Sequence, residues 1–137
     1  MDAVFETPDG YGSKVRSYRD LQIWQRSLEL AVACFGATKG FPASEAFGLT
    51  SQIRRAAGSI PANIAEGFGR WNVADFIRFL RIAQGSLKEL ETHLLLSERV
   101  AFLDPDATAK LLAECDEIGR MLHAFIASLQ KRKSRRT

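Results

Sequence analysis

The sequence predicts an all-α protein that folds as an antiparallel, up-and-down four-helix bundle. Apolar residues recur at alternating intervals of three and four positions through four stretches of the chain. Short segments rich in glycine, proline or aspartate separate these stretches. No stretch shows the strict alternation of apolar and polar residues that indicates a strand, so we predict none. Four helices joined by short turns pack antiparallel to their neighbours, and each buries its apolar face.

The first two helices are predicted from their apolar series and from candidate capping residues. Asp20 is a candidate N-cap for the first helix, residues 40–42 (Gly-Phe-Pro) end it, and Ser44 is a candidate N-cap for the second. The apolar series of the first helix is Leu21, Trp24, Leu28, Ala31 and Phe35. The series of the second helix is Leu49, Ile53, Ala56, Ile60, Asn63 and Gly67.

The third and fourth helices have the most regular spacing. Residues 67–72 (Gly-Phe-Gly-Arg-Trp-Asn) form the turn before the third helix, and its glycines are expected to supply a positive φ. Asp104 is expected to cap the last helix, with Pro105 at the first helical position. The series of the third helix is Val73, Phe76, Leu80, Ala83, Leu87, Leu90 and Leu94. The series of the fourth is Leu111, Cys115, Ile118, Leu122, Phe125 and Leu129.

The chain is expected to form one domain with a short segment at each end. Residues 1–17 contain proline and glycine without periodicity and are expected to be flexible. Residues 18–130 form the bundle, and residues 131–137 form a basic tail that is expected to be disordered. This tail carries five of the nineteen basic residues, which leaves fourteen basic and sixteen acidic residues in the rest of the chain. The net charge of +3 therefore comes from the tail.

The second helix contains an unusual motif within residues 59–67, in which Pro61, Asn63, Glu66 and Gly67 have structural roles. Proline in a helix interior removes a backbone hydrogen bond and costs about 3 kcal/mol, so we expect a kink at Pro61. Asn63 falls in the apolar series, and a buried amide is costly unless it is hydrogen-bonded. One interpretation is that Asn63 satisfies carbonyls freed by the kink or fixes the helix register. The other is a polar site within the bundle.

The chain has more large apolar residues than one narrow core needs. Seven large apolar residues outside the four series stand out as surplus: Ile23, Phe47, Phe68, Trp71, Phe79, Ile82 and Phe102. Some can fill the core or loops, but on outer faces they would form patches that monomers rarely expose. Residues 54–88 contain six basic and two acidic residues, whereas residues 104–129 contain five acidic and two basic residues. Contact between such unlike surfaces favours a ring-like homo-oligomer.

Three stretches of the sequence resemble a known family. They are residues 18–25 (YRDLQIWQ), 47–70 (FGLTSQIRRAAGSIPANIAEGFGR) and 79–91 (FLRIAQGSLKELE). Together they look like the bacterial four-helix bundle family named for proteins encoded in intervening sequences of 23S ribosomal RNA genes. The resemblance covers about residues 18–130. The accessory proteins of diversity-generating retroelements look like distant members.

This resemblance implies an up-and-down bundle that assembles as a homopentameric ring and has no enzymatic activity. It also suggests nucleic-acid binding, because the retroelement relatives bind nucleic acid and a reverse transcriptase through a basic barrel. Gln84 departs from the family pattern, in which a basic residue is common at this position. That departure lowers the charge expected on the binding face.

No arrangement of residues in the sequence indicates catalysis, a metal site or a cofactor. His93 and His123 lie on different predicted helices without carboxylates or cysteines at ligand spacing. Residues 67–70 lack the strand–turn–helix context of a phosphate-binding loop. Cys34 and Cys115 are interpreted as reduced core thiols of a cytoplasmic protein. Apolar runs are only a few residues long, so no membrane span is expected. The first twenty residues lack the apolar stretch of a signal peptide, so none is expected. No feature of the sequence points to a small-molecule substrate.

Nucleic-acid binding is also predicted from clusters of basic residues. The candidates are Arg54, Arg55, Arg70, Arg78, Arg81 and Lys88 on the helices and Lys131, Arg132 and Lys133 in the tail. Arg78, Arg81 and Lys88 form a stripe on one helix, and the tail adds candidate phosphate contacts. Alternatively, the stripe forms salt bridges with Asp75 or with a neighbour's last helix, and the tail serves solubility. The partner is RNA, DNA or a nucleoprotein in the first interpretation. In the second, the protein is a protein-interaction scaffold without nucleic-acid affinity.

Overall fold

The computed structural model describes residues 3–4 and 14–135, and four helices account for most of this length. In chain order the elements are β1 (Ala3–Val4), β2 (Lys14–Val15), the 3-10 helix η1 (Tyr18–Asp20), α1 (Gln22–Thr38), the 3-10 helix η2 (Ala43–Glu45), α2 (Leu49–Phe68), α3 (Val73–Arg99) and α4 (Pro105–Arg135). The predicted all-α class is confirmed. The sequence pattern missed β1 and β2, which pair antiparallel over two residues each and are too short to show alternation.

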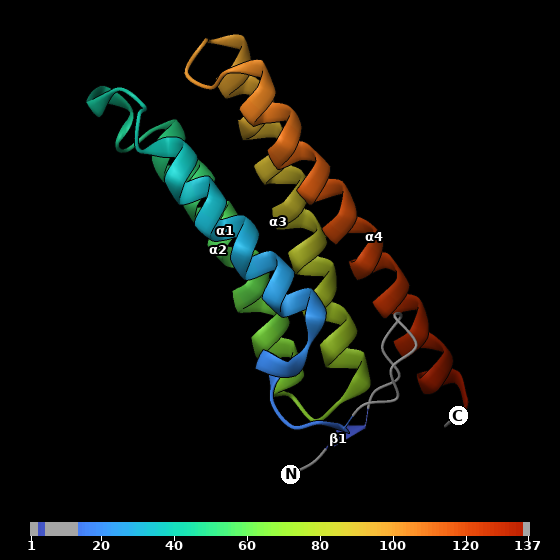
Figure 1. The fold of residues 1–137 in the computed structure, drawn as a ribbon. Coiled ribbons are helices and arrows are strands. Elements are labelled where there is room, and N and C mark those ends of the chain that lie inside the picture. The colour runs from blue at the N-terminus through green and yellow to red at the C-terminus, as the bar shows by residue number, and fades with distance from the viewer. Residues whose placement is uncertain (1–2, 5–13, 136–137) are drawn as a thin grey trace.

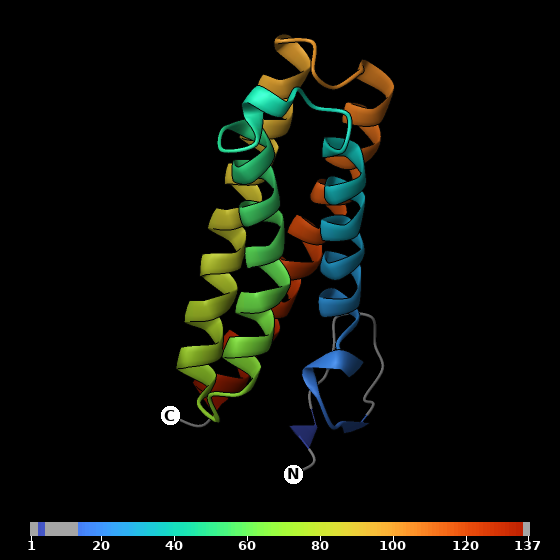
Figure 2. The ribbon, with the colours of Figure 1, turned by 90° about the vertical axis from the view of Figure 1, so that its left-hand side faces the viewer.

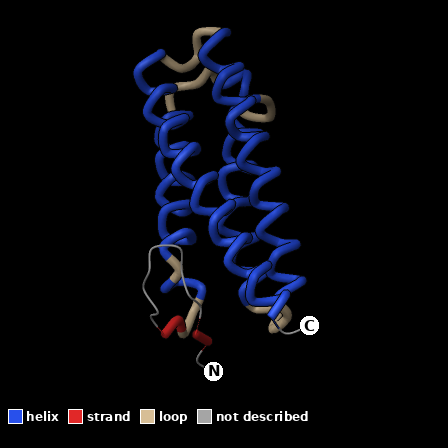
Figure 3. The backbone as a smooth tube through the Cα atoms, turned by 90° about the vertical axis from the view of Figure 1, so that its right-hand side faces the viewer, coloured by secondary structure: helices blue, strands red, loops and turns tan. Residues whose placement is uncertain are grey.

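The helices form an up-and-down bundle in which each helix packs against its two neighbours in cyclic order (Figure 1). The interface between α2 and α3 is the most extensive, and that between α1 and α4 is the smallest. The α2–α3 turn, η1 and the C-terminal end of α4 lie at one end of the bundle, opposite the α1–α2 and α3–α4 connections (Figure 2). The loops are confined to these two ends (Figure 3). In the described part of the chain, no helix is long and apolar enough to cross a membrane.

The core follows the predicted series closely in α3 and α4. Every member of these two series is buried except Val73, which is half-buried at the start of α3. In α2 the buried members of the series are Ile53, Ala56, Ile60 and Gly67. The other two, Leu49 and Asn63, are half-buried. Apolar spacing therefore identifies the inward face of three of the four helices.

The series predicted for α1 is wrong in part. Leu28 and Phe35 are 41% and 44% exposed. The side chains of α1 that face the core are Ile23, Ser27, Leu30, Ala31, Cys34 and Thr38. Ser27 and Thr38 can be buried because their hydroxyls donate to carbonyl oxygens of the preceding turn at 3.0 and 2.9 Å. A series that counts only apolar residues places such hydroxyl side chains on the outer face.

Two predicted helix starts are also wrong. Asp20 does not cap α1, because its carboxylate accepts the backbone N–H of Ser17 at 3.1 Å and completes a capping box on η1. Ser44 lies inside η2, and α2 begins only at Leu49. In both places a single 3-10 turn precedes the α-helix. At the first place the capping residues mark the 3-10 turn instead of α1, whereas η2 has no side-chain capping hydrogen bond.

The start of α4 is confirmed, but its end lies further along the chain than predicted. The Oδ1 atom of Asp104 accepts the backbone N–H of Ala107 at 2.8 Å, and α4 begins at the residue after Asp104. The helix then continues through Arg135, so residues 131–135 are helical and not a disordered tail. Basic side chains stabilise a helix C-terminus because they face the negative end of its dipole. Residues 136–137 lie outside the described residues.

The segment predicted to be flexible, residues 1–17, is described only in part. Residues 1–2 and 5–13 lie outside the described residues. Val15 is 1% exposed and belongs to the hydrophobic core, while the Ser17 side chain accepts the first hydrogen bond of η1. The end of this segment therefore packs against the bundle, because it carries an apolar anchor and a capping residue.

The turn between α2 and α3 uses its glycines differently from the prediction. Gly69 has a φ of −76°, and the positive φ of the turn, 61°, belongs to Trp71. Gly67 is required for close packing instead. A Cβ atom at this position would lie 2.7 Å from the Cβ atom of Phe79 and 2.9 Å from the Cδ1 atom of Phe76. Glycine at the end of α2 thus allows α3 to approach closely.

Candidate nucleic-acid interface

The described residues hold no group of three or more His, Cys, Asp or Glu side chains that could bind a metal ion. Cys34 and Cys115 are free and buried, and burial raises the pKa of each thiol to about 12. Because a thiol with such a pKa remains protonated near neutral pH, it is a poor nucleophile and a poor metal ligand. His93 faces the Glu89 carboxylate at 3.6 Å, one helix turn away. The two cysteines are therefore core thiols, and His93 lies beside a carboxylate of its own helix.

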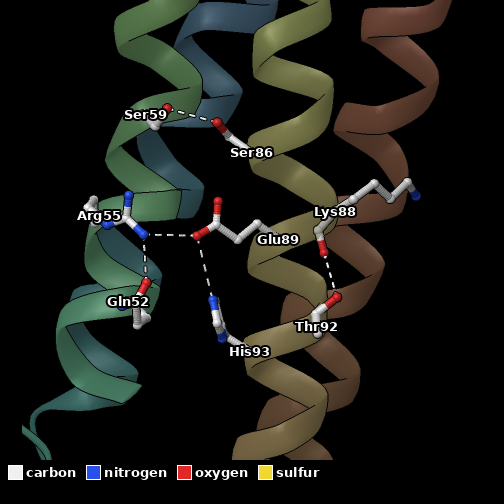
Figure 4. A network of polar contacts seen from close by, with 8 residues as sticks. All are labelled: Gln52, Arg55, Ser59, Ser86, Lys88, Glu89, Thr92 and His93. Atoms are coloured by element: carbon white, nitrogen blue, oxygen red, sulfur yellow. Dashed lines mark hydrogen bonds and ion pairs between the residues drawn. The ribbon is translucent and has the colours of Figure 1, made fainter. Parts of the chain in front are cut away.

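The interface between α2 and α3 contains a polar network (Figure 4). The Arg55 guanidinium donates to Gln52 Oε1 at 2.6 Å and to Glu89 Oε1 at 3.1 Å. The same Glu89 oxygen lies 3.6 Å from His93 Nε2. These contacts join the two helices at their surface. Arg55, a predicted nucleic-acid-binding residue, therefore already has two hydrogen-bond partners within the chain.

The Pro61 motif belongs to the same α2–α3 interface. Helix α2 runs through Pro61 as one element, so the kink stays a prediction. The Asn63 side-chain amide donates to the Ser59 carbonyl and hydroxyl oxygens at 2.8 and 3.0 Å. The Ser59 hydroxyl in turn lies 2.8 Å from the hydroxyl of Ser86 on α3 (Figure 4). Proline at position 61 leaves the carbonyl of Ala57, not that of Ser59, without its helical donor. Asn63 therefore links α2 to α3 through Ser59 and does not satisfy the freed carbonyl.

The predicted basic stripe of α3 is only partly free. Arg78 Nε lies 3.7 Å from Asp75 Oδ1, and Lys88 Nζ lies 3.0 Å from Glu91 Oε2. Arg81 is exposed and has no hydrogen-bond or ion-pair partner among the residues that the structure describes. The salt bridge expected between Arg78 and Asp75 is confirmed. Of the stripe, Arg81 alone keeps an unpaired charge in the described chain.

Two further candidate arginines stack on phenylalanine rings. The Arg54 guanidinium carbon lies 4.8 Å from the Phe35 ring centroid, and its Nε donates to a threonine hydroxyl of α1 at 2.9 Å. The Arg70 guanidinium carbon lies 5.2 Å from the Phe79 centroid, and its Nη2 is 2.6 Å from Glu66 Oε1. Arg54 is held at the α1–α2 interface, whereas Arg70 lies at the exposed end of α2.

A shallow groove of about 390 Å³ opens between the first turns of α3 and the last turns of α4. Together with an adjoining hollow on α3, it is lined by Ala74, Ile77, Arg78, Arg81, Ile82, Gln130, Lys133 and Ser134. We call this lining the end groove. It contains three basic side chains and no carboxylate. Lys133 is exposed and, like Arg81, has no partner in the described part of the chain.

The end groove brings together residues from two basic clusters that are far apart in the sequence. Arg78 and Arg81 come from α3, and Lys133 comes from the segment predicted to be a tail. Because residues 131–135 are helical, α4 brings its basic side chains to the same end of the bundle as the α2–α3 turn (Figures 1 and 2). We call the end groove together with Arg70, Lys131, Arg132 and Arg135 the basic end. Arg54, Arg55 and Lys88 lie nearer the middle or the opposite end of their helices.

The seven apolar residues that the sequence marks as surplus to the core divide into two groups. Ile23 is buried, and Phe68, Phe79 and Phe102 are half-buried. The exposed members are Phe47 at 96%, Trp71 at 76% and Ile82 at 42%. A further apolar strip lies on the outer face of α1, and two of its three members were predicted to face the core. It consists of Leu28, Val32 and Phe35, which are 41%, 67% and 44% exposed and spaced by four and three positions; we call it the α1 strip.

Comparison with known proteins assigns the chain to a family. Residues 19–124 match the family described as the 23S rRNA-intervening sequence protein. The chain belongs to this family. It is also similar to the crystal structure of a protein with unknown function from the S23 ribosomal protein family of Bacteroides thetaiotaomicron. That similarity has 29% sequence identity and a TM-score of 0.69, and it covers 76% of this chain and 97% of the other. A search of the curated proteins gave no match.

The match to the 23S rRNA-intervening sequence protein family includes only part of the end-groove lining. Arg78 and Arg81 lie inside the matched residues 19–124, whereas Gln130 and Lys133 lie beyond them.

The sequence did not indicate Gln130 as a lining residue of the end groove, nor Ala74, Ile77 and Ser134. These residues could have been identified only from helical spacing, because they lie on the same side of α3 or α4 as a candidate basic residue. Ile82 and Trp71 could have been identified as surface residues, because both fall outside the apolar series predicted to form the core.

Proposed function

We propose that this protein is a non-enzymatic, cytoplasmic nucleic-acid-binding accessory protein that holds phosphate groups at its basic end. The end groove carries this proposal. Arg81 and Lys133 reach it from different helices, its lining holds no carboxylate, and neither residue has a partner in the described chain. Like charges that share a groove raise its positive potential, and a bound anion lowers the resulting repulsion. The buried, free cysteines support a reducing location such as the cytoplasm.

Basic residues that are already paired at this end can still bind phosphate. The side chains of Arg78 and Asp75 are 58% and 47% exposed. An exposed ion pair contributes only about 0.2–1 kcal/mol, so a phosphate can replace Asp75 at small cost. A guanidinium also has five N–H donors, which allows it to bind two acceptors at once. Arg78 and Arg70 therefore extend the interface around the unpaired cations.

The proposal is tested by fluorescence anisotropy with labelled RNA and DNA of about 20 nucleotides. We expect dissociation constants of about 1–100 μM near 0.1 M salt, the range of electrostatic, sequence-independent binding. Failure of both nucleic acids to bind under these conditions would contradict the proposal. It would favour the scaffold function, in which the basic residues serve contacts within or between protein chains.

We also propose that the protein self-associates into a ring-like homo-oligomer, with five copies as the family resemblance implies. The α1 strip supports self-association, because three apolar side chains on one outer face are a patch that another protein surface can cover. The same strip supports the scaffold alternative, in which the covering surface belongs to a different protein. The mass of the purified protein distinguishes these two possibilities.

Replacing Val32 with glutamate is expected to dissociate the oligomer. Val32 is 67% exposed in the single chain, so the new carboxylate stays hydrated in the protomer but is buried when another copy covers the strip. Light scattering coupled to size exclusion is expected to show a multimer for the wild type and a smaller species for V32E. Ala33→Glu is the matched control, since Ala33 is exposed on the same helix but lies off the strip. A monomeric wild type, or a V32E variant of unchanged mass, would refute the assignment.

A further inference from the structure

Trp71, which directly follows Arg70 of the basic end, is an unusual exposed residue. It is 76% exposed, in the turn that joins α2 to α3. Its φ of 61° lies in the left-handed region, which is unfavourable for a bulky side chain and normally contains glycine or asparagine. Neither core packing nor backbone geometry therefore requires tryptophan at this position. An exposed tryptophan on a strained turn is the kind of feature that occurs at binding sites.

Two arginines near Trp71 in the chain are each paired with a carboxylate, Arg70 with Glu66 and Arg78 with Asp75. Arg70 precedes Trp71, and Arg70 and Arg78 both hold their guanidinium carbons over the Phe79 ring, at 5.2 and 4.5 Å from its centroid. Ala74, three residues after Trp71, lines the end groove. The C-terminal end of α4, with its basic side chains, lies at the same end of the bundle as this turn (Figures 1 and 2). An exposed indole and several cations thus share one end of the molecule.

We propose that Trp71 is a stacking platform for an unpaired base, so that the basic end prefers single-stranded RNA or DNA to duplex. This inference rests on the proposed nucleic-acid-binding function. A single strand presents both its phosphates and the faces of its bases, whereas a duplex hides the base faces in its own stack. Phosphates bound by Arg78, Arg81 and Lys133 would place a neighbouring base against the exposed indole. Stacking is insensitive to base identity, so the preference concerns strandedness and not sequence.

The experiment uses the full chain and separates binding from stacking. Trp24 and Trp71 are the only tryptophans in the sequence, so Trp24→Phe leaves Trp71 as the single source of tryptophan emission. Oligo(U), oligo(dT) and a duplex of equal length are titrated, and anisotropy of the labelled nucleic acid reports binding while Trp71 emission reports stacking. We expect both single strands to quench Trp71 and to bind more tightly than the duplex. Should Trp24→Phe unfold the protein, the difference in quenching between wild type and Trp71→Phe gives the same information.

A second set of variants measures the contribution of the ring. Trp71→Ala is expected to weaken single-strand binding roughly 5- to 150-fold, the range expected when one stacked base is removed, and to leave duplex binding nearly unchanged. Trp71→Phe is expected to recover most of the affinity. Phe47→Ala is the matched control and is expected to have no effect. Phe47 is 96% exposed in the α1–α2 connection, which lies at the opposite end of the bundle from the α2–α3 turn.

The outcomes distinguish the two proposals. Binding without Trp71 quenching, or equal losses for single strand and duplex in Trp71→Ala, overturns the stacking inference and leaves the proposed function standing. Absence of binding to all three nucleic acids overturns both. Quenching by oligo(U) but not by oligo(dT) restricts the inference to RNA, and the reverse result restricts it to DNA.

Discussion

Replacing Gly67 with alanine is expected to lower the free energy of unfolding by about 1–3 kcal/mol, the usual cost of overpacking a core. The added Cβ atom would lie 2.7 Å from the Phe79 Cβ atom and 2.9 Å from a ring carbon of Phe76. The first of these contacts is the more severe, because a Cβ atom moves only with its backbone. Helices α2 and α3 must therefore separate at this end. Urea unfolding followed by circular dichroism measures the change.

Gly85→Ala is the matched control for this prediction. Gly85 also lies within a helix, but a Cβ atom at this position meets no atom within 4 Å. Alanine there is expected to raise stability by roughly 0.5–1 kcal/mol, because glycine is the poorer helix former. Equal effects of the two substitutions would show that α2 and α3 do not approach each other at Gly67 as closely as the structure indicates.

Charge reversal in the end groove is expected to weaken nucleic-acid binding roughly 10- to 100-fold near 0.1 M salt. The double variant Arg81→Glu/Lys133→Glu removes two phosphate-binding cations and places two carboxylates in the groove. Both residues are exposed and unpaired in the described chain, so the fold is expected to survive. Anisotropy titrations measure the affinity, and circular dichroism confirms that the variant is folded.

The matched control is Arg99→Glu/Lys110→Glu, which changes the net charge by the same amount at the opposite end of the bundle. Arg99 and Lys110 are both exposed, near the connection of α3 and α4. We expect less than a threefold effect from this variant, because exposed charges further apart than about 10 Å are largely screened at 0.1 M salt. Similar losses in the two double variants would show that net charge, and not the end groove, determines binding.

The sequence predicts the bundle well because three of its helices carry one dominant apolar series. α1 is the exception, since Leu28 and Phe35 continue a regular series on a face that stays exposed, while Ser27 and Thr38 are buried. Only tertiary packing decides between two such faces. Capping residues locate a turn of helix but do not specify whether that turn is 3-10 or α, as Asp20 shows.

The candidate interface was less predictable than the fold. Residue type and spacing identified Arg78 and Arg81, and composition identified the cluster around Lys133. Their convergence depends on the continuation of α4 through residues 131–135 and on the packing of α4 beside α3, and neither follows from local sequence. The in-chain partners of Arg55 and Arg54 are also tertiary contacts. The sequence could not separate these engaged arginines from Arg81, which is unpaired in the described chain.

The most direct test of phosphate binding at the basic end is the salt dependence of the association constant. The logarithm of this constant is expected to fall linearly with the logarithm of salt concentration, with a slope set by the number of phosphates bound. We predict that Arg81→Glu/Lys133→Glu reduces the steepness of the wild-type slope by about 2, one unit for each phosphate that the variant no longer binds. Unchanged slopes, or no measurable wild-type affinity near 0.1 M salt, would contradict the assignment of the basic end as a nucleic-acid interface.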